Sequence, residues 1–88
     1  MDKLIAVAVF DAAVGSFNRP FFVPSLGLAL RSFADEVNRY DDNNPMSRHP
    51  NDFSLYKLGS YDEISGRFDS LDVPERLSLA RDVQILED

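Results

Sequence analysis

Aromatic and basic side chains that could hold a nucleic acid gather between residues 17 and 22. Phe17, Phe21 and Phe22 surround Arg19 in this segment, and rings interleaved with a guanidinium can stack bases and hold a phosphate. Alternatively, the rings turn inward and fix a proline-stiffened loop to a small core. We expect Phe21 or Phe22 to be largely buried and Arg19 to be exposed, which leaves too small a surface to hold DNA alone. An exposed pair of rings flanked by Arg19 and a second arginine would instead favour DNA binding.

A second candidate group is the polar segment 48–52. Arg48, His49 and Asp52 could form an acid–base pair or an anion site, but no recognisable nucleophile motif accompanies them. The alternative is structural, with Asn51 or Asp52 capping a turn and His49 bonding to nearby backbone. We favour the structural alternative and expect no enzyme activity.

Metal and cofactor chemistry has little support in the sequence. The paired acids Asp41-Asp42 and Asp62-Glu63 could attract a cation, but their spacing matches no EF-hand. The chain has no cysteine and one histidine, which excludes disulfides, thiol catalysis and a multi-histidine site within one chain. Neither glycine-rich phosphate-binding motif occurs. We therefore expect no metal and no cofactor.

The charge balance argues against a global attraction to DNA. Nine basic and fifteen acidic residues give a net charge of −6, whereas nucleic-acid binders are usually basic. Weak binding is expected unless Arg19, Arg31, Arg48 and Lys57 converge, because affinity grows with each phosphate neutralised. An acidic surface instead suits docking to a basic protein. The candidate residues for binding a nucleic acid or a partner are Phe17, Arg19, Phe21, Phe22, Arg31, Arg48, His49 and Lys57.

The first element that must position these groups is a strand over residues 4–10. Its continuous β-branched apolar run is typical of a strand buried on both faces, and therefore central in its sheet. The odd-numbered residues form a bulky face, whereas Ala6 and Ala8 leave a shallow face. A helix or a second copy of the chain could approach the shallow face closely, and we expect the helix there.

The next expected elements are a loop over 12–25 and a helix over 26–40 with Ser25 as its N-cap. Asp35 can pair with Arg31 or Arg39 on the solvent side of the helix. The apolar stripe that we expect to face the first strand is Leu26, Leu30, Phe33, Val37 and Tyr40.

The second half of the chain predicts a β-hairpin. A loop runs to Pro50, a strand covers 53–61, and a turn over 62–66 places Gly66 at positive φ. The partner strand covers 67–71, and Pro74 can open a short helix. Beyond Ala80 the pattern fits both a helix and a strand.

Together these elements predict one α+β domain over residues 1–88, with a small, mostly antiparallel sheet and one main helix. A last strand would make the arrangement similar to a ferredoxin-like fold. Because so short a chain has a marginal core, we expect a homodimer through the Ala6/Ala8 face or an exposed sheet edge. The longest apolar run is too short to span a bilayer, so no membrane partner is expected.

Several segments, read together, resemble one small phage family. They are the strand that ends at Asp11, the segment Pro20–Pro24, the helix start at Ala29–Phe33, and the block His49–Gly59 with the turn over 61–66. The block reads His-Pro-x-Asp-Phe-x-Leu-Tyr-x-Leu-Gly and is the most specific part. Over roughly residues 3–80 the chain resembles the non-structural protein of gokushovirus-type microviruses, the tailless single-stranded DNA phages.

The resemblance implies a role in producing viral single-stranded DNA in the host bacterial cytoplasm. The related protein of the coliphage branch switches replication from duplex to single-strand synthesis during packaging. The implied partners are the phage replication initiator, host replication proteins or the single strand itself, and no catalytic residues carry over. Two functions stay open: a replication-regulating interaction protein, which we favour, and a single-strand DNA-binding module that stacks bases on Phe17, Phe21 or Phe22.

The block from His49 to Gly59 is expected to be mainly architectural, because it mixes turn and strand residues without a nucleophile. Asn51 or Asp52 would end the loop by bonding to backbone. Gly59 would permit a bulge or a close backbone approach.

Overall fold

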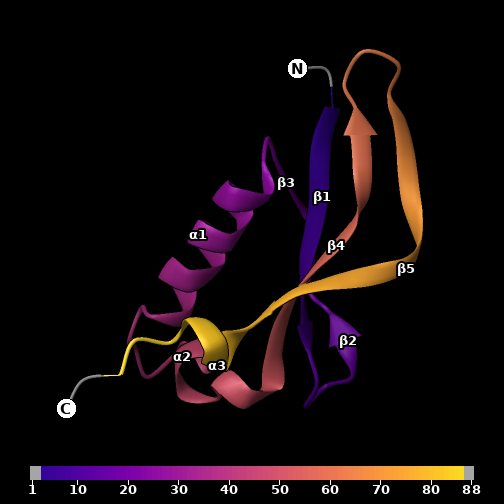
Figure 1. Ribbon diagram of the computed structural model, residues 1–88. Coiled ribbons are helices and arrows are strands. Elements are labelled where there is room, and N and C mark those ends of the chain that lie inside the picture. The colour runs from indigo at the N-terminus through magenta and orange to yellow at the C-terminus, as the bar shows by residue number, and fades with distance from the viewer. Residues whose placement is uncertain (1–2, 87–88) are drawn as a thin grey trace.

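The computed structural model describes residues 3–86 and contains an antiparallel sheet, one main helix and short helical turns (Figure 1). The strands are β1 (Lys3–Asp11), β2 (Ser16–Phe17), β3 (Phe21–Val23), β4 (Phe53–Asp62) and β5 (Arg67–Leu79). The helices are α1 (Leu26–Val37), α2 (Pro45–Arg48), α3 (Ala80–Val83) and the 3-10 turn η1 (Pro50–Asp52). The predicted α+β class is confirmed.

Strand β1 is central, as predicted. One of its edges pairs with β4, and the other pairs with β2 and then β3. Strand β5 lies beyond β4 at the edge of the sheet. The prediction of a loop over residues 12–25 is wrong, because β2 and β3 lie inside it. Strands of two and three residues have no periodic signal of their own, and they form because β1 offers them hydrogen-bonding partners.

The ferredoxin-like arrangement is also wrong. Strands β1 and β4, which precede and follow α1, are antiparallel neighbours, whereas a βαβ unit joins parallel strands. After Leu79 the chain forms α3 rather than a last strand. The two readings of the C-terminal pattern are thereby resolved in favour of a short helix.

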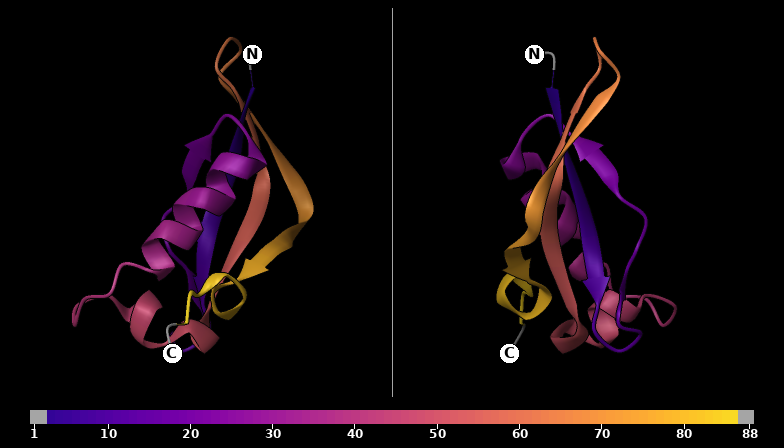
Figure 2. Two further views of the ribbon diagram at one scale, coloured as in Figure 1. Left: turned by 60° about the vertical axis from the view of Figure 1, so that its left-hand side comes forward. Right: turned by 90° about the vertical axis from the view of Figure 1, so that its right-hand side faces the viewer.

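Helix α1 covers one side of the sheet, here called the helix side, which carries Val7 and Val9 (Figure 2). Phe33 is only 2% exposed in this core, so the prediction that the helix packs on the first strand is confirmed. The expectation that it packs on Ala6 and Ala8 is wrong, because the branched side chains of the other face bury more apolar area. The core comprises Val7, Val9, Val23, Ala29, Phe33, Val37, Met46, Phe53, Leu55 and Ala80.

The start of α1 is confirmed and its end is corrected. The Ser25 hydroxyl accepts a hydrogen bond from the Leu28 N–H at 3.2 Å, as an N-cap should. The helix ends at Val37 instead of Tyr40, and the Tyr40 hydroxyl donates to the Ile85 carbonyl at 2.6 Å. Tyr40 thus ties down the C-terminal segment instead of extending the stripe. Among residues 3–86 no helix is long and apolar enough to cross a membrane.

The charged side of α1 pairs differently from the prediction. Arg39 donates to both carboxylate oxygens of Glu36, at 2.9 and 2.8 Å, and not to Asp35. This hydrogen bond lowers the pKa of Glu36. Because about half of each side chain is exposed, solvent screening keeps the contribution to stability small.

The segment after α1 is held by one buried amide. Asn44 is 2% exposed, and its side chain accepts from the Met46 N–H at 3.1 Å as the N-cap of α2. The same amide donates to the carbonyls of Glu36 and Arg39, both at 2.8 Å. The loop predicted up to Pro50 therefore contains a helical turn that is fastened to the end of α1.

The β4–β5 hairpin turns where predicted. Gly66 has a φ of 75° and donates its N–H to the Asp62 carbonyl at 2.7 Å. The Ile64 N–H donates to the Asp62 carboxylate at 2.9 Å, which holds the pKa of Asp62 below its usual range. Positive φ is costly for any residue with a Cβ, so glycine is favoured at this position.

Strand β5 is longer and less regular than predicted. It continues to Leu79 and contains Pro74, where a helix was expected. Residues 71–74 lie opposite Leu58 without register partners of their own, so Pro74 breaks no ladder hydrogen bond. Strand β5 bends away from β4 at this elbow (Figure 1).

Gly59 allows the close backbone approach that was predicted. A Cβ at this position would collide with the carbonyl oxygen of Asp69 and lie 2.9 Å from the Cα of Ser70. The register of β1 and β4 also shifts beside it, because Ala6 pairs with Gly59 while Val7 pairs with Lys57. Gly59 therefore sets the curvature of the sheet at this bulge.

Candidate binding surface

The side of the sheet opposite α1, here called the open face, carries most of the aromatic side chains. Cα partners across antiparallel strands point to the same side, so the register assigns each strand residue to a face. Phe22 pairs with Ala6, Tyr61 with Leu4, and both lie opposite the side of Val7. Six of the ten aromatic residues fall on the open face: Phe10, Phe17, Phe22, Tyr56, Tyr61 and Phe68.

The first group of rings, here the Phe17 cluster, joins β2, β1 and β4. Phe17 lies 4.9 Å from Phe10 and 5.3 Å from Tyr56 between ring centroids, both edge to face. Phe17 remains 41% exposed. Such edge-to-face packing is favourable, and it leaves part of each ring open to solvent.

The second group, here the Phe22 cluster, joins β3, β4 and β5. Tyr61 lies 5.6 Å from Phe22 and 4.8 Å from Phe68 between ring centroids. Phe68 is 66% exposed and Phe22 is 42% exposed. Strand β3 and the β4–β5 hairpin therefore together present one apolar, partly exposed surface.

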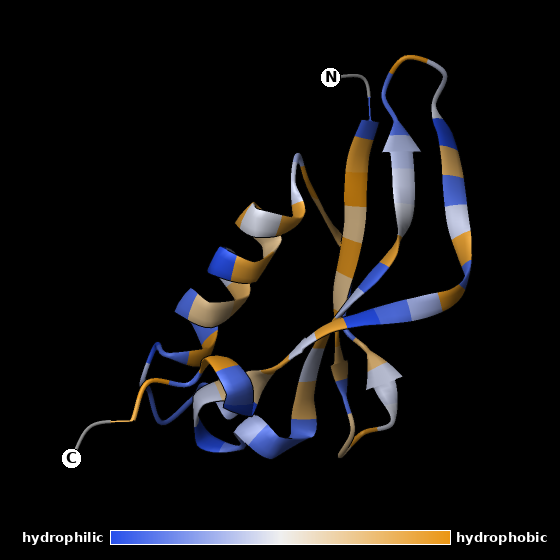
Figure 3. Cartoon of the chain, in the orientation of Figure 1, coloured by the Kyte–Doolittle hydropathy of each residue, from blue (hydrophilic) through white to orange (hydrophobic). Residues whose placement is uncertain are grey.

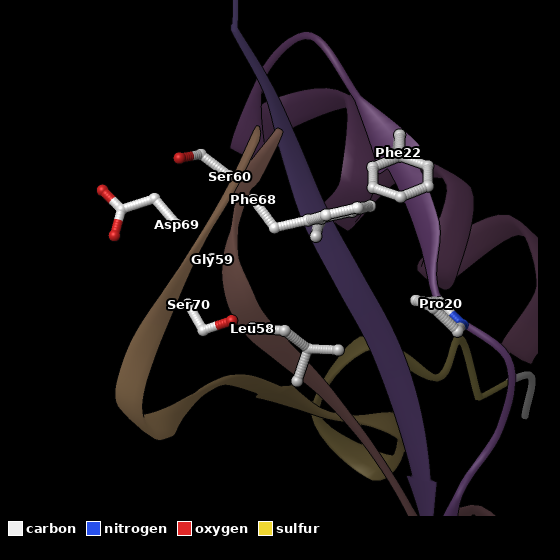
Figure 4. Close-up of a pocket in the computed structure, with 9 residues that line it drawn as sticks. Pro20, Phe22, Leu58, Gly59, Ser60, Phe68, Asp69 and Ser70 are labelled. Carbon is white, nitrogen blue, oxygen red and sulfur yellow. The ribbon is translucent and has the colours of Figure 1, made fainter. Parts of the chain in front are cut away.

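A shallow hollow of about 150 Å³ adjoins the Phe22 cluster. Phe22, Phe68, Leu58 and Pro20 surround it (Figure 4), and Ala6 contributes to its lining. Small side chains on β1 thus leave room between the large ones.

Charge is divided between the two sides of the sheet. The paired strand acids all fall on the helix side by register, and Asp69 points away from the rings (Figure 4). Arg76, which pairs with Tyr56, is the one charged residue among the paired strand positions of the open face within residues 3–86. The hydropathy pattern shows the same alternation along β5 (Figure 3). The acids concerned are Asp11, Asp62, Asp69 and Glu75.

Comparison with known proteins places the chain in a phage family. A family model described as Phage ORF5 protein matches residues 4–83, which include all six open-face rings. The chain belongs to this family. No curated protein and no solved structure matches it.

In this phage protein the predicted aromatic residues separate. Phe17 and Phe22 lie on the open face, whereas Phe21 pairs with Val7 and packs, half-buried, against the core. Arg19 is exposed in the segment that joins β2 to β3. Rings from β1, β4 and β5 extend the aromatic surface beyond the segment that the sequence singled out.

The other predicted cations do not join the open face. Arg31 is exposed on α1, on the opposite side of the sheet, and Arg48 donates to the Asp42 carbonyl at 3.1 Å. Lys57 pairs with Val7 and therefore belongs to the helix side. The four cations therefore do not converge, which was the stated condition for strong electrostatic binding of DNA. Arg76 lies on the open face and was not among the residues singled out from the sequence.

The polar segment 48–52 is held by backbone rather than by the predicted side chains. His49 is exposed and caps η1 without a side-chain hydrogen bond. The Asp52 N–H donates to the His49 carbonyl at 3.0 Å, and the Asp52 carbonyl accepts from Ala12 at 2.8 Å. The nearby side-chain cap is Asn44, eight residues before Asp52. Within the described chain no group of three or more acids and histidines could hold a metal ion.

Four of the six rings escaped the sequence analysis, namely Phe10, Tyr56, Tyr61 and Phe68. Their signal was present: Phe10 continues the Ala6–Ala8 face of the first strand at a spacing of two. In β4 the pattern is interrupted, because a bulge at Leu58 shifts the alternation of side chains between the two faces, so Tyr56 and Tyr61 share a face although they are five residues apart. Such a bulge follows from pairing with β1 and cannot be read from one strand alone.

Proposed function

We propose that this phage protein supports or regulates viral single-stranded DNA synthesis in the cytoplasm of the infected bacterium, by binding and not by catalysis. We further propose that the open face binds the single strand directly. The observation that carries this proposal is the combination of six clustered rings with an arginine and no acid among the paired positions of that face.

Stacking supplies the attraction that the net charge does not. A base stacked on an aromatic ring contributes about 1–3 kcal/mol, and Phe17, Phe22 and Phe68 each expose ring surface. Arg76 on the face and Arg19 beside it meet the condition of exposed rings flanked by two arginines. With only about two phosphates neutralised, the salt slope should be shallow, about −1 to −2.

Docking to the replication initiator or a host replication protein remains the second candidate. The β4–β5 arm favours it, because residues 62–75 contain five acids and one arginine. Ile64 is 78% exposed and Val73 is 74% exposed on the same arm. An acidic arm with apolar side chains suits a basic partner. The two candidates use different parts of the surface, so they can be tested separately.

Titration of the purified protein against a labelled oligothymidylate tests the first candidate. The double variant Phe22→Ala/Phe68→Ala should bind about tenfold more weakly, since the exposed rings of the Phe22 cluster, which stack a base, are lost. Ile64→Ala removes an even more exposed apolar side chain from the hairpin turn and serves as the control. Equal affinity in the double variant and the control, or no binding by the unaltered protein in low salt, contradicts DNA binding at the open face.

The second candidate has its own variant. Charge reversal at Asp72 and Glu75 leaves the rings intact, so DNA affinity should not fall. If this variant loses binding to the purified replication initiator while the unaltered protein binds it and ignores DNA, the docking function replaces the proposed one. The ratio of single-stranded to duplex viral DNA in infected cells then reports which surface matters for synthesis.

A further inference from the structure

The Phe17 cluster and the Phe22 cluster are two separate aromatic sites on the open face, here called stations. Phe17 packs with Phe10 and Tyr56, and Phe22 packs with Tyr61 and Phe68. No ring pair within residues 3–86 joins the two clusters. The first centres near residue 9 of β1 and the second near residue 5, by register. At about 3.3 Å per strand residue, the stations lie about 13 Å apart.

A cation lies at the sheet edge between these stations. Arg19 is in the segment 18–20, which connects the strand that carries Phe17 to the strand that carries Phe22. The Asn18 N–H donates to the Val9 carbonyl at 2.7 Å, which keeps this segment against β1. Ala8 lies on this side of β1 by register and is fully buried. Along β1 the open face therefore alternates an exposed ring cluster, a buried small residue beside the segment that carries Arg19, and a second exposed ring cluster.

From this alternation we infer that one DNA strand binds along β1, with a base on each cluster and a connecting phosphate at Arg19. The inference rests on the proposed function and adds the number and order of contacts. Rings accept any base on their faces, so the strand is held with little regard to sequence. A guanidinium between the stations neutralises the phosphate that must pass from one base to the other.

Two linked stations make affinity depend on strand length. A strand too short to reach both clusters engages one of them, whereas a longer one engages the second as an intramolecular event. Affinity should rise when the oligonucleotide becomes long enough to bridge, and then change little. Removing either station should abolish this rise and leave the affinity of the short strands.

The test measures affinity for oligothymidylates from two to about twelve nucleotides, a range around the site size of small binding domains. The variant Phe17→Leu and the double variant Phe22→Leu/Phe68→Leu keep apolar packing and remove the exposed flat rings of one cluster each. Each should lose the rise with length while thermal melting stays unchanged. Arg19→Ala should weaken only bridging strands and reduce the salt slope by about 0.7. Arg31→Ala removes the same charge from the opposite side and should change neither.

The outcomes separate this inference from the proposed function. If the unaltered protein binds no oligonucleotide, both fail. If it binds with no rise in affinity with length, or if only one of the two leucine variants has an effect, the two-station inference fails and DNA binding stands. Equal effects of Arg19→Ala and Arg31→Ala also overturn it, because a general charge effect then explains both.

Discussion

Both sides of the sheet carry apolar side chains, but those of the helix side are buried and several of those on the open face are exposed. On the helix side Val7 and Leu55 are fully buried beneath α1. On the open face Phe22 and Phe68 pack on neighbouring rings and stay 42% and 66% exposed. Alternate residues of β1 and β4 lie on the two sides, so the same strands contribute to the buried core and to the exposed aromatic surface. Contiguous exposed apolar patches of this kind often bind other molecules, and our proposal places the interaction site on this face for that reason.

Charge makes the difference between the sides sharper. The acids of the paired strand positions alternate with the rings along the strands, so they lie on the helix side of the sheet. The open face thereby avoids most of the repulsion that a net charge of −6 would impose on DNA. Net charge alone is therefore a poor guide to what one face of a small protein can bind.

The largest loss of stability is expected for a substitution on the helix side. Phe33→Ala removes a ring that is 2% exposed at the centre of the core and should lower the free energy of unfolding by about 3–5 kcal/mol. Urea denaturation measures this loss. A change below about 1 kcal/mol would be that of a surface site and would contradict the assignment of this side as the core.

A smaller loss is expected at the end of α1. Asn44→Ala removes the cap of α2 and leaves two backbone carbonyls without their donor, which should cost about 1–3 kcal/mol. Asn43→Ala changes the exposed neighbouring residue and is the matched control. If both variants unfold at the same urea concentration, the buried amide does not fasten the helices as described.

A still smaller effect on stability is expected on the open face. Phe68→Ala should lower the free energy of unfolding by less than about 1 kcal/mol, because the ring is mostly exposed and loses only cross-strand contacts. The same urea series measures it beside Phe33→Ala. A loss as large as that of Phe33 would show that the open face is part of the folding core.

The smallest effect concerns the pH-dependent stability that the Glu36–Arg39 pair contributes at the surface of α1. The bond from Arg39 lowers the pKa of Glu36 in the folded protein, so its stabilisation is present above the usual carboxyl pKa. That stabilisation is lost as the pH falls through the lowered value. Glu36→Gln should lower stability by about 0.2–0.5 kcal/mol at neutral pH and make no difference in acid. Asp35→Asn should show no such pH-dependent loss of stability. If it does, the Glu36–Arg39 ion pair is not the source of the effect.

The fold was predictable where local signals were strong. The apolar run of β1, the Ser25 cap and the Gly66 turn each determine their structure through neighbours in sequence. Strands β2 and β3 were not predictable, because their two and three residues depend on β1 for every partner. Pro74 was misread as a helix start because its strand bends away from β4 where it lies.

The candidate site was only partly predictable for the same reason. Phe17 and Phe22 attracted attention as neighbours of Arg19, yet Phe68 and Arg76 reach the open face through the pairing of β5 with β4. That pairing skips four residues at the elbow, so periodicity in β5 does not reveal which side its residues face. A surface assembled across five strands becomes visible only with the register.

The central claim is that the open face, and not the helix side, contacts single-stranded DNA. Side-chain NMR signals of an isotope-labelled sample, followed during titration with an oligothymidylate, test it most directly. The account predicts that the ring signals of Phe17, Phe22 and Phe68 shift with added DNA while those of Phe33 and Phe53 stay in place. Shifts confined to the helices or the hairpin turn, with the open-face rings unmoved, would contradict it.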